Sequence, residues 1–307
     1  MKVIGITGSQ GKTTTKEFLY SVLQNEGTTV ATAGNFNTDI GVPLTLLRST
    51  EATKFCILEM GARHVGDIAK LTELANPNVG VVLVVGTAHL GEFGSVEAIA
   101  KTKSELIKAL SPKMTAVLGT YDQFTPKMAD SLDLNTVLFG DGQIVRAADI
   151  ELHGGFAHFD LVTSFGRESV ALRQAGRHQV ANALAAAAIA TAFNMPIDKI
   201  SAGLSTAENS SKWRMELHEI AGRLVINDSY NANPESMYAA LDSLRLFAQE
   251  RGGRAWAFLG KMHELGEHSL SGHHKVSRRA IDLEIDHLVA IGTPEYLGES
   301  ELGSTEI

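Results

Sequence analysis

Short, continuously apolar segments alternate with longer segments of helical spacing along the first half of the chain. Apolar runs of this kind predict parallel strands that are covered on both faces. The predicted strands are residues 3–7, 55–58, 79–85, 115–118 and 136–139. The predicted helices are residues 13–25, 65–74 and 96–110. This alternation predicts an α/β fold with a mostly parallel, doubly wound sheet.

The pattern changes twice along the rest of the chain. Residues 143–172 form extended segments with glycine-containing turns, which predict an antiparallel addition, and an Ala-rich helix over residues 178–193 closes this unit. A second α/β set starts near residue 222. Its predicted strands lie near residues 224–227, 255–259 and 287–291, and its helices follow Pro234 and begin near His268. The predicted domains are residues 1–207 and 222–307, joined by a linker over residues 208–221.

Composition narrows the class of protein. The 307 residues are 44% hydrophobic and carry a formal net charge of -8, without a long Lys/Arg run, which argues against a nucleic-acid or membrane-binding surface. Cys56 is the only cysteine and stands in an apolar run, so it is expected to be buried in a strand, and a disulfide within the chain is excluded. No segment has the pattern of a signal peptide or a membrane span. A reducing, cytoplasmic setting is expected.

The first predicted strand leads directly into a phosphate-binding pattern at the start of a helix. Backbone N–H groups and the helix dipole at such a place can hold phosphate. Lys12 is expected to reach the terminal phosphates and Thr13 to bind magnesium. The usual pattern has glycine where Ile6 stands, so the loop is a variant. The loop is Gly8-Ser9-Gln10-Gly11-Lys12-Thr13-Thr14, and it predicts nucleotide binding without specifying the reaction.

Further runs over most of the chain, in the same order, resemble the Mur ligase family, whose central domain is a P-loop ATPase domain. The resemblance implies a fold in which that domain is followed by a Rossmann-like α/β domain. The matching runs are residues 5–17, 34–47, 59–64, 86–95, 100–105, 176–184, 213–216, 227–234 and 259–267.

The resemblance implies roles for several charged residues. Glu59 resembles the carboxylate that holds one magnesium ion, and His89 resembles a ligand of a second. Lys103 matches a lysine that relatives carry as a carbamate, which would be an oxygen ligand for that second ion. Taken alone, His89 would be an ordinary loop histidine and Lys103 part of a solvated helix face. The implied metal ligands are Thr13, Glu59, His89 and Lys103.

Other matches imply contacts with the nucleotide. Asn182 resembles a residue that contacts adenine, and His178 belongs to the same motif. Arg214 resembles an arginine that meets the terminal phosphate, and Asp228 an acid that holds the ribose hydroxyls. The alternatives are a hinge salt bridge for Arg214 and a turn cap for Asp228.

The family's substrate loop matches a polar segment of this chain. Asn35, Asn37 and Thr38 are implied to face the muramoyl-peptide substrate, and Arg63 follows the metal-binding strand. His64 is a candidate for deprotonating the incoming amine, although an orienting or structural role fits it equally well. The implied catalytic set is Lys12, Lys103, Arg214 and His64.

The reaction implied is ATP-dependent joining of a carboxylate to an amine through an acyl phosphate, with release of ADP and phosphate. Within the family, the runs are most similar to ligases that add D-alanyl-D-alanine to UDP-N-acetylmuramoyl-tripeptide in peptidoglycan synthesis. The expected protein is a monomer that uses ATP and two Mg²⁺ ions on small-molecule substrates, without nucleic-acid or membrane partners.

The chain departs from the family pattern at both ends. Full-length relatives have a domain before the phosphate loop and a longer C-terminal domain, so the chain is expected to be a fragment with a partial second domain. Three alternatives stay open. They are another amide ligase of the superfamily, such as a folylpolyglutamate synthetase; a nucleotide-binding module without turnover; and a P-loop motor or signalling NTPase.

Overall fold

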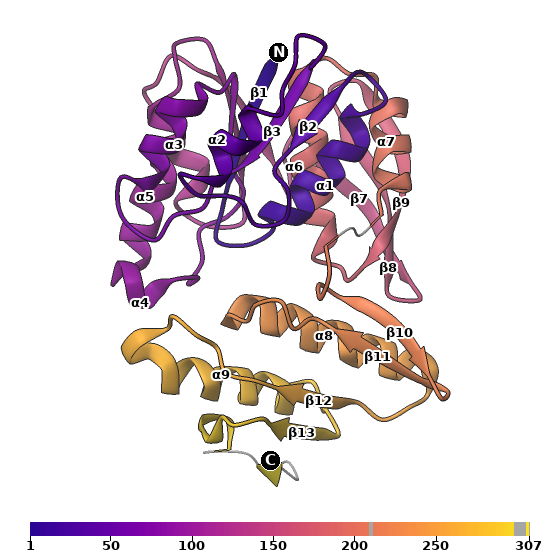
Figure 1. Ribbon diagram of the computed structural model, residues 1–307. Coiled ribbons are helices and arrows are strands. Elements are labelled where there is room, and N and C mark those ends of the chain that lie inside the picture. Colours follow the sequence, from indigo (N-terminus) through magenta and orange to yellow (C-terminus); the bar gives the residue numbers. More distant parts are fainter. Residues whose placement is uncertain (209–210, 298–304, 307) are drawn as a thin grey trace.

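A six-stranded parallel sheet forms the centre of the first part of the chain (Figure 1). The computed structural model describes residues 1–208, 211–297 and 305–306. The strand order is β2-β3-β1-β4-β5-β6, which confirms the parallel, doubly wound arrangement. The strands are β1 (Lys2–Thr7), β2 (Thr29–Ala31), β3 (Phe55–Glu59), β4 (Val79–Val82), β5 (Thr115–Gly119) and β6 (Asn135–Phe139).

The strand predicted over residues 79–85 is shorter in the structure, because β4 ends at Val82. Leu83 N still donates to Thr7 O at the end of β1, and the backbone leaves the ladder from Val85 on. Val85 N donates to Asp122 Oδ2 at 2.9 Å, and Gly86 N donates to Ser9 Oγ at 2.8 Å. The apolar pattern of residues 83–85 therefore reflects burial of a segment that runs on past the strand into a loop.

Helices cover both faces of the sheet. Alternate residues of β1 point to opposite sides: Ile4 and Ile6 pack in the core beneath α1, α6 and α7, while Val3 packs in the core beneath α3 and α5. Cys56 is fully buried in the second core, as the sequence predicted. The helices are α1 (Lys12–Leu23), α2 (Gly41–Leu46), α3 (Asp67–Ala75), α4 (Leu90–Phe93), α5 (Val96–Lys108), α6 (Gln179–Ala192) and α7 (Ile197–Thr206).

A three-stranded antiparallel sheet packs against α6 and α7 and confirms the extended segments expected over residues 143–172. Its inward residues, among them Phe159 and Leu161, join the same core as α6. Its strands are β7 (Arg146–His153), β8 (Phe156–Thr163) and β9 (Gly166–Ala175), and a 3-10 turn, η1 (Thr125–Lys127), precedes β6.

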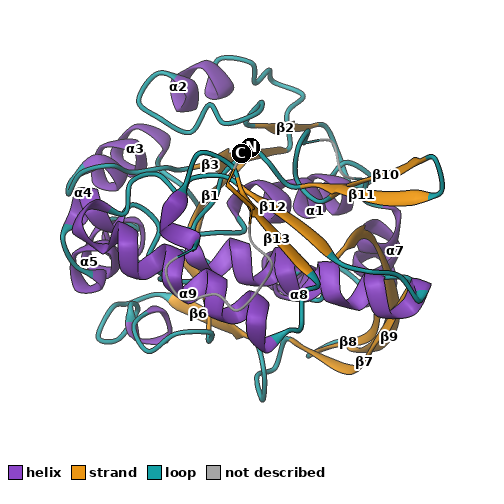
Figure 2. Ribbon diagram, turned by 90° about the horizontal axis from the view of Figure 1, so that it is seen from below, coloured by secondary structure: helices purple, strands orange, loops and turns teal. Residues whose placement is uncertain are grey.

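The C-terminal part of the chain, residues 211–297 together with 305–306, lies below the first part in Figure 1. Its helices α8 and α9 lie side by side (Figure 2) and share one core with the parallel strands β12 and β13. The elements are β10 (Glu216–Ile220), β11 (Arg223–Asn227), α8 (Pro234–Arg251), β12 (Trp256–Leu259), η2 (Gly266–His268), α9 (Ser269–Asp282), β13 (His287–Ala290), η3 (Pro294–Tyr296) and β14 (Thr305–Glu306).

The strand expected near residues 224–227 is not part of that parallel sheet. It is β11, and it pairs with β10 in an antiparallel hairpin. Strand β10 lies inside the range 208–221 that was predicted as a linker, because its backbone N–H and C=O groups find partners on β11. The division of the chain into domains at this place stays a prediction. None of the helices described here is both long and apolar enough to cross a membrane.

Candidate active site

The phosphate loop connects β1 to α1 and is closed on one side by α6. Gly11 stands at φ 81°, and a Cβ atom added there would lie 2.2 Å from Asn182 Oδ1. Glycine is therefore required twice, for its left-handed backbone and for the close approach of the Asn182 side chain. The contact places one expected adenine-binding residue directly against the phosphate loop.

Changing Gly11 to alanine separates these two requirements. We expect the left-handed backbone to cost about 1–2 kcal/mol of folding stability. The clash with Asn182 should in addition raise the Kd for ADP at least about tenfold. Gly222→Ala is the matched control, because Gly222 has φ 75° and open space around its Cβ position. Thermal unfolding and calorimetric titration measure both effects, and equal ADP affinity in the two variants would contradict the prediction.

Lys12 is held at the mouth of the loop. Its Nζ donates to Gly8 O at 2.9 Å. Burial lowers the pKa of Lys12, the charge of Glu59 raises it, and the charge of Arg214 lowers it. Lys12 thus lies in one electrostatic cluster with Glu59 and Arg214, the residues expected on the metal and the terminal phosphate.

Glu59 ends β3 beside the first turn of α1. It is 2% exposed. Thr13 Oγ1 donates to its Oε2 at 2.9 Å, and Asn37 Nδ2 donates to its Oε1 at 2.9 Å. Asn37, expected in the substrate loop, therefore also positions the carboxylate. Thr38 and Asn35 are exposed on the same loop.

Arg214 reaches the phosphate loop from the C-terminal part. Its guanidinium donates to Thr13 Oγ1 at 3.3 Å and stacks on the Tyr230 ring, 3.9 Å from the ring centroid. The residues on either side, Trp213 and Met215, have φ of 63° and 49°. Such left-handed backbone is unfavourable for residues other than glycine, and it aims the Arg214 side chain at α1.

Asp228 lies next to this turn and accepts a hydrogen bond from Met215 N at 3.0 Å. Burial raises the pKa of Asp228 to about 6, although that hydrogen bond and the Arg214 charge act in the opposite direction. The turn-cap alternative is thus realised in the structure, and contact with a ribose stays a prediction.

Lys103 and His89 complete the charged cluster. Lys103 is 6% exposed, and burial together with the charge of Lys12 lowers its pKa to about 7. No carboxylate among the described residues offsets this shift. Burial also lowers the pKa of His89, with Glu264 raising it and Lys12 and Lys103 lowering it. Lys103 is therefore no member of a solvated helix face, unlike the exposed Lys101 and Lys108.

His178 and Asn182 diverge on α6. Asn182 Nδ2 donates to Gln179 Oε1 at 2.8 Å and faces the phosphate loop. His178 precedes the first turn of the helix, and burial lowers its pKa to about 4. It lines a cavity of about 760 Å³ between α6, β7 and α8. A second cavity, of about 620 Å³, runs from Thr13 along α1 to Asn35 and Tyr230.

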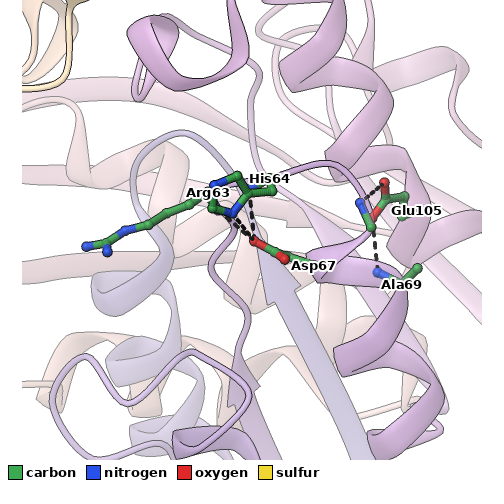
Figure 3. A network of polar contacts seen from close by, with 6 residues as sticks. Arg63, His64, Asp67, Ala69 and Glu105 are labelled. Atoms are coloured by element: carbon green, nitrogen blue, oxygen red, sulfur yellow. Dashed lines mark hydrogen bonds and ion pairs between the residues drawn. The ribbon is translucent and has the colours of Figure 1, made fainter.

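Arg63 and His64 stand at the start of the α3 region, where Figure 3 shows their backbones held by Asp67. Both backbone N–H groups donate to Asp67 Oδ2, at 3.0 and 2.9 Å. The His64 side chain is 74% exposed, and its Nδ1 lies 3.7 Å from Asp67. Its described contacts do not join it to the Lys12 cluster, and its part in deprotonating an amine stays a prediction. Glu105 secures the same turn by accepting from Gly66 N and Ala69 N.

Sequence reasoning missed five residues that the structure brings to this region. Lys16, one helical turn after Lys12, donates to Thr32 O at 2.9 Å, and Thr32 Oγ1 accepts from Glu59 N at 3.0 Å. In the sequence, only the closeness of Lys16 and Thr32 to the motifs indicated that they belong to the site. The other three are Thr87, Glu235 and Glu264: Glu235 contacts Thr87, and Glu264 contacts His89, across parts of the chain that only the fold brings together.

The side-chain atoms of the implied metal ligands differ in how well they suit Mg²⁺. Thr13 and Glu59 place hard oxygens side by side at the phosphate loop, which suits Mg²⁺. His89 and an ammonium form of Lys103 do not suit it, whereas a carbamate on Lys103 would supply oxygen. Among the described residues there is no cluster of three or more His, Cys, Asp and Glu able to hold a metal. The first position therefore fits as it stands, and the second fits only with modified lysine.

A variant phosphate loop on a parallel sheet, joined to a second α/β unit that sends an arginine to it, defines a P-loop protein of two parts. Residues 6–190 match the Mur ligase middle domain, and residues 213–303 match the Mur ligase, glutamate ligase domain. The chain belongs to the Mur ligase family.

Individual relatives narrow the similarity. The UDP-N-acetylmuramoyl-tripeptide--D-alanyl-D-alanine ligases of Mycobacterium tuberculosis H37Rv and Escherichia coli K12 are 42% and 34% identical to this chain. The alignments cover 99% and 96% of this chain, and 61% and 65% of those proteins. The chain therefore spans less than two thirds of these relatives.

Solved structures agree in fold. A crystal structure of MurF from Acinetobacter baumannii matches 99% of this chain and 67% of its own, with TM-score 0.93 and 38% identity. MurF from Thermotoga maritima in complex with ADP matches 100% of this chain and 70% of its own, with TM-score 0.87 and 31% identity. A folylpolyglutamate synthase from Thermotoga maritima, 16% identical with TM-score 0.71, shares the fold alone.

Proposed function

We propose that this chain is the nucleotide-binding and catalytic core of an ATP-dependent carboxylate–amine ligase. The reaction is addition of D-alanyl-D-alanine to UDP-N-acetylmuramoyl-tripeptide in peptidoglycan synthesis. The observation that carries this proposal is the convergence of Lys12, Thr13, Glu59 and Arg214 at the first turn of α1. The ligases named above, which are 34–42% identical, support the substrate assignment.

In the first step, an oxygen of the tripeptide carboxylate attacks the terminal phosphorus of ATP, and ADP leaves. Negative charge develops on the transferred phosphoryl group. Lys12 and Arg214 reach it from the two parts of the chain, and preorganised cations at such a place lower the barrier. Arg214 is already oriented by Tyr230 and needs little reorganisation.

In the second step, the free amine of D-alanyl-D-alanine attacks the acyl carbon. The C–O bond to the phosphate breaks, so the phosphate leaves with one former carboxylate oxygen, and the ammonium proton must go to a base. His64 is the proposed acceptor of that proton; its alternative role is to orient the amine, with water taking the proton. The proposed substrate-facing residues are Asn35, Asn37, Thr38 and Arg63.

Magnesium and the nucleotide are proposed at the remaining sites. Thr13 and Glu59 would hold one Mg²⁺, and His89 with carbamylated Lys103 a second; bound there, the ions would neutralise phosphate charge. The loop from Gly8 through Ser9, Gln10 and Gly11 to Thr14 would hold the phosphates, with His178 and Asn182 at the adenine and Asp228 at the ribose. A cytoplasmic monomer is the proposed state.

Carbamylation of Lys103 has a direct test. The Lys103 amine is buried, its pKa is lowered to about 7, and no carboxylate among the described residues pairs with it, so it is available to react with carbon dioxide. In ¹³C-bicarbonate buffer we expect a carbamate carbonyl signal from the chain that Lys103→Ala lacks and Lys101→Ala retains. Lys101 is the matched control because it is an exposed lysine on the same helix. A signal that is absent from the parent chain, or that persists in Lys103→Ala, would contradict this assignment.

The proposed function is tested by ADP release from the purified chain with Mg·ATP, UDP-N-acetylmuramoyl-tripeptide and D-alanyl-D-alanine. Release that requires both substrates supports the ligase. Replacing the dipeptide by glutamate separates it from other amide ligases of the family. ADP binding without turnover would instead identify a nucleotide-binding module.

A further inference from the structure

Residues 86–91, here called the bridging loop, lie between the phosphate loop and the C-terminal part of the chain. On one side, Gly86 N donates to Ser9 Oγ of the phosphate loop at 2.8 Å. On the other side, the loop is contacted by Glu235 and Glu264, which both belong to the C-terminal part. His89 is in the middle of this loop, so its surroundings come from both parts.

Glu235 fixes the bridging loop two residues before His89. Its Oε1 accepts from Thr87 N at 3.0 Å, and Thr87 Oγ1 lies 2.8 and 2.9 Å from its two oxygens. Glu235 stands in the first turn of α8, where a capping box at Asn233 orders the backbone and the helix dipole favours a negative charge. The carboxylate is thus preset for Thr87.

Glu264 fixes the same loop two residues after His89. Gly91 N donates to Glu264 O at 2.9 Å. A Cβ atom added to Gly91 would lie 2.6 Å from Gly266 N, so the two backbones are in contact. Both sides of His89 are therefore held by the C-terminal part.

The side chain of Glu264 then reaches the His89 ring itself. Glu264 Oε2 lies 2.5 Å from His89 Nδ1, which is an ion-pair distance and not a well-aligned hydrogen bond. A carboxylate oxygen and a ring nitrogen that both carried bare lone pairs would repel at this distance, so the proton belongs on Nδ1. A neutral ring then keeps its lone pair on Nε2. His89 and Glu264 also have φ of 63° and 62°, a left-handed backbone that is unfavourable for residues other than glycine.

We infer that Glu264 is a positioning residue, which sets the ring orientation and the Nδ1–H tautomer of His89 from the C-terminal part of the chain. Metal-binding histidines commonly donate their second ring N–H to a carboxylate, which leaves the other nitrogen free for the ion. Here that carboxylate comes from the other part of the chain. The second metal position would therefore be complete only when the two parts are in contact. The role toward metal depends on the proposed function, whereas the tautomer does not.

The tautomer is measured on the metal-free chain, labelled with ¹⁵N-histidine, at a pH where the His89 ring is neutral. His89→Gln assigns the signals. We expect Nδ1–H in the parent chain and a shift toward Nε2–H in Glu264→Ala, while Glu264→Gln, which keeps an acceptor oxygen, retains Nδ1–H. Glu267→Ala is the matched control, because Glu267 lies in the same motif with a 90% exposed side chain. An unchanged tautomer in Glu264→Ala would overturn the inference.

The role toward metal is measured with Mn²⁺ as the probe, in the presence of ADP. Removing the carboxylate that accepts the N–H of a metal-binding histidine weakens metal binding about 10–100-fold. We expect this decrease in Mn²⁺ affinity in Glu264→Ala and not in Glu267→Ala. A shifted tautomer with unchanged Mn²⁺ affinity would refute the role toward metal. A shifted tautomer in a chain that never shows ligase turnover would leave the Glu264–His89 assignment standing and defeat the proposed function, so the two failures are distinguishable.

Discussion

Replacing Lys12 by alanine is expected to lower substrate-dependent ADP release at least about 100-fold, the effect of removing one preorganised donor from a charge-stabilising site. The ammonium is held over the phosphate loop by its bond to Gly8 O, and the charge of Glu59 raises its pKa. Lys12 and Arg214 are the two cationic side chains that we place at the transferred phosphoryl group. Without Lys12, Arg214 alone would stabilise the negative charge that develops there.

Two further variants distinguish position from charge. Lys12→Arg keeps the cation, but its longer, planar head does not fit the bond to Gly8 O, so it is expected to be nearly as inactive. Lys108→Ala removes an exposed lysine of α5 and is expected to retain full activity. Steady-state kinetics with circular dichroism as a folding check measures all three. Turnover of Lys12→Ala within tenfold of the parent chain would contradict the assignment.

Replacing Glu59 by glutamine is the second change with a large expected effect. The carboxylate accepts from Thr13 and Asn37 at its two oxygens. An amide offers one acceptor for Asn37 and one donor that the Thr13 hydroxyl can accept, so the fold is kept while the negative charge for the metal is lost. We expect ADP affinity to become independent of Mg²⁺ concentration and turnover to fall at least about 100-fold.

Glu105→Gln is the matched control for this change. Glu105 also accepts two hydrogen bonds, from Gly66 N and Ala69 N, but at the start of α3 (Figure 3). We expect it to lower stability without changing the Mg²⁺ dependence of ADP binding, measured by calorimetry at several Mg²⁺ concentrations. A Glu59→Gln chain whose ADP affinity still rises with Mg²⁺ would place the metal elsewhere.

The elements that the sequence predicted are those with strong local patterns. Strands β1, β3 and β5 are buried along their whole length or nearly so, and α5 has an apolar stripe that begins after a Ser95 cap. Strand β2 was missed because only three residues pair, and their neighbours belong to a loop. Helix α4 has four residues and no buried side chain, so it has no periodicity to detect.

The hairpin of β10 and β11 shows a different limit. Its residues are half-buried or exposed, so the apolar signal of residues 224–227 did not reveal whether the partner strand was parallel or antiparallel. The pairing is set by the turn at Gly222, which has a left-handed backbone. Local pattern predicted a strand there, and only the tertiary structure identifies its partner.

The candidate site likewise contains residues that sequence motifs predict and contacts that only the tertiary structure shows. Lys12, Thr13 and Glu59 were predictable because a motif places them on β1, α1 and the end of a neighbouring parallel strand. The contacts of Asn182 with Gly11, and of Glu235 with Thr87, join residues more than 100 positions apart. No spacing in the sequence encodes such contacts, because they depend on how α6 packs on the phosphate loop and on how the two parts pack.

The proposed ligase reaction requires that phosphoryl transfer activates the tripeptide carboxylate. The most direct measurement follows ¹⁸O from a labelled carboxylate of UDP-N-acetylmuramoyl-tripeptide during turnover with Mg·ATP and D-alanyl-D-alanine. We expect each released phosphate to carry one labelled oxygen, in step with amide formation. Release of ADP with unlabelled phosphate would mean that water attacks ATP, and it would contradict the ligase mechanism.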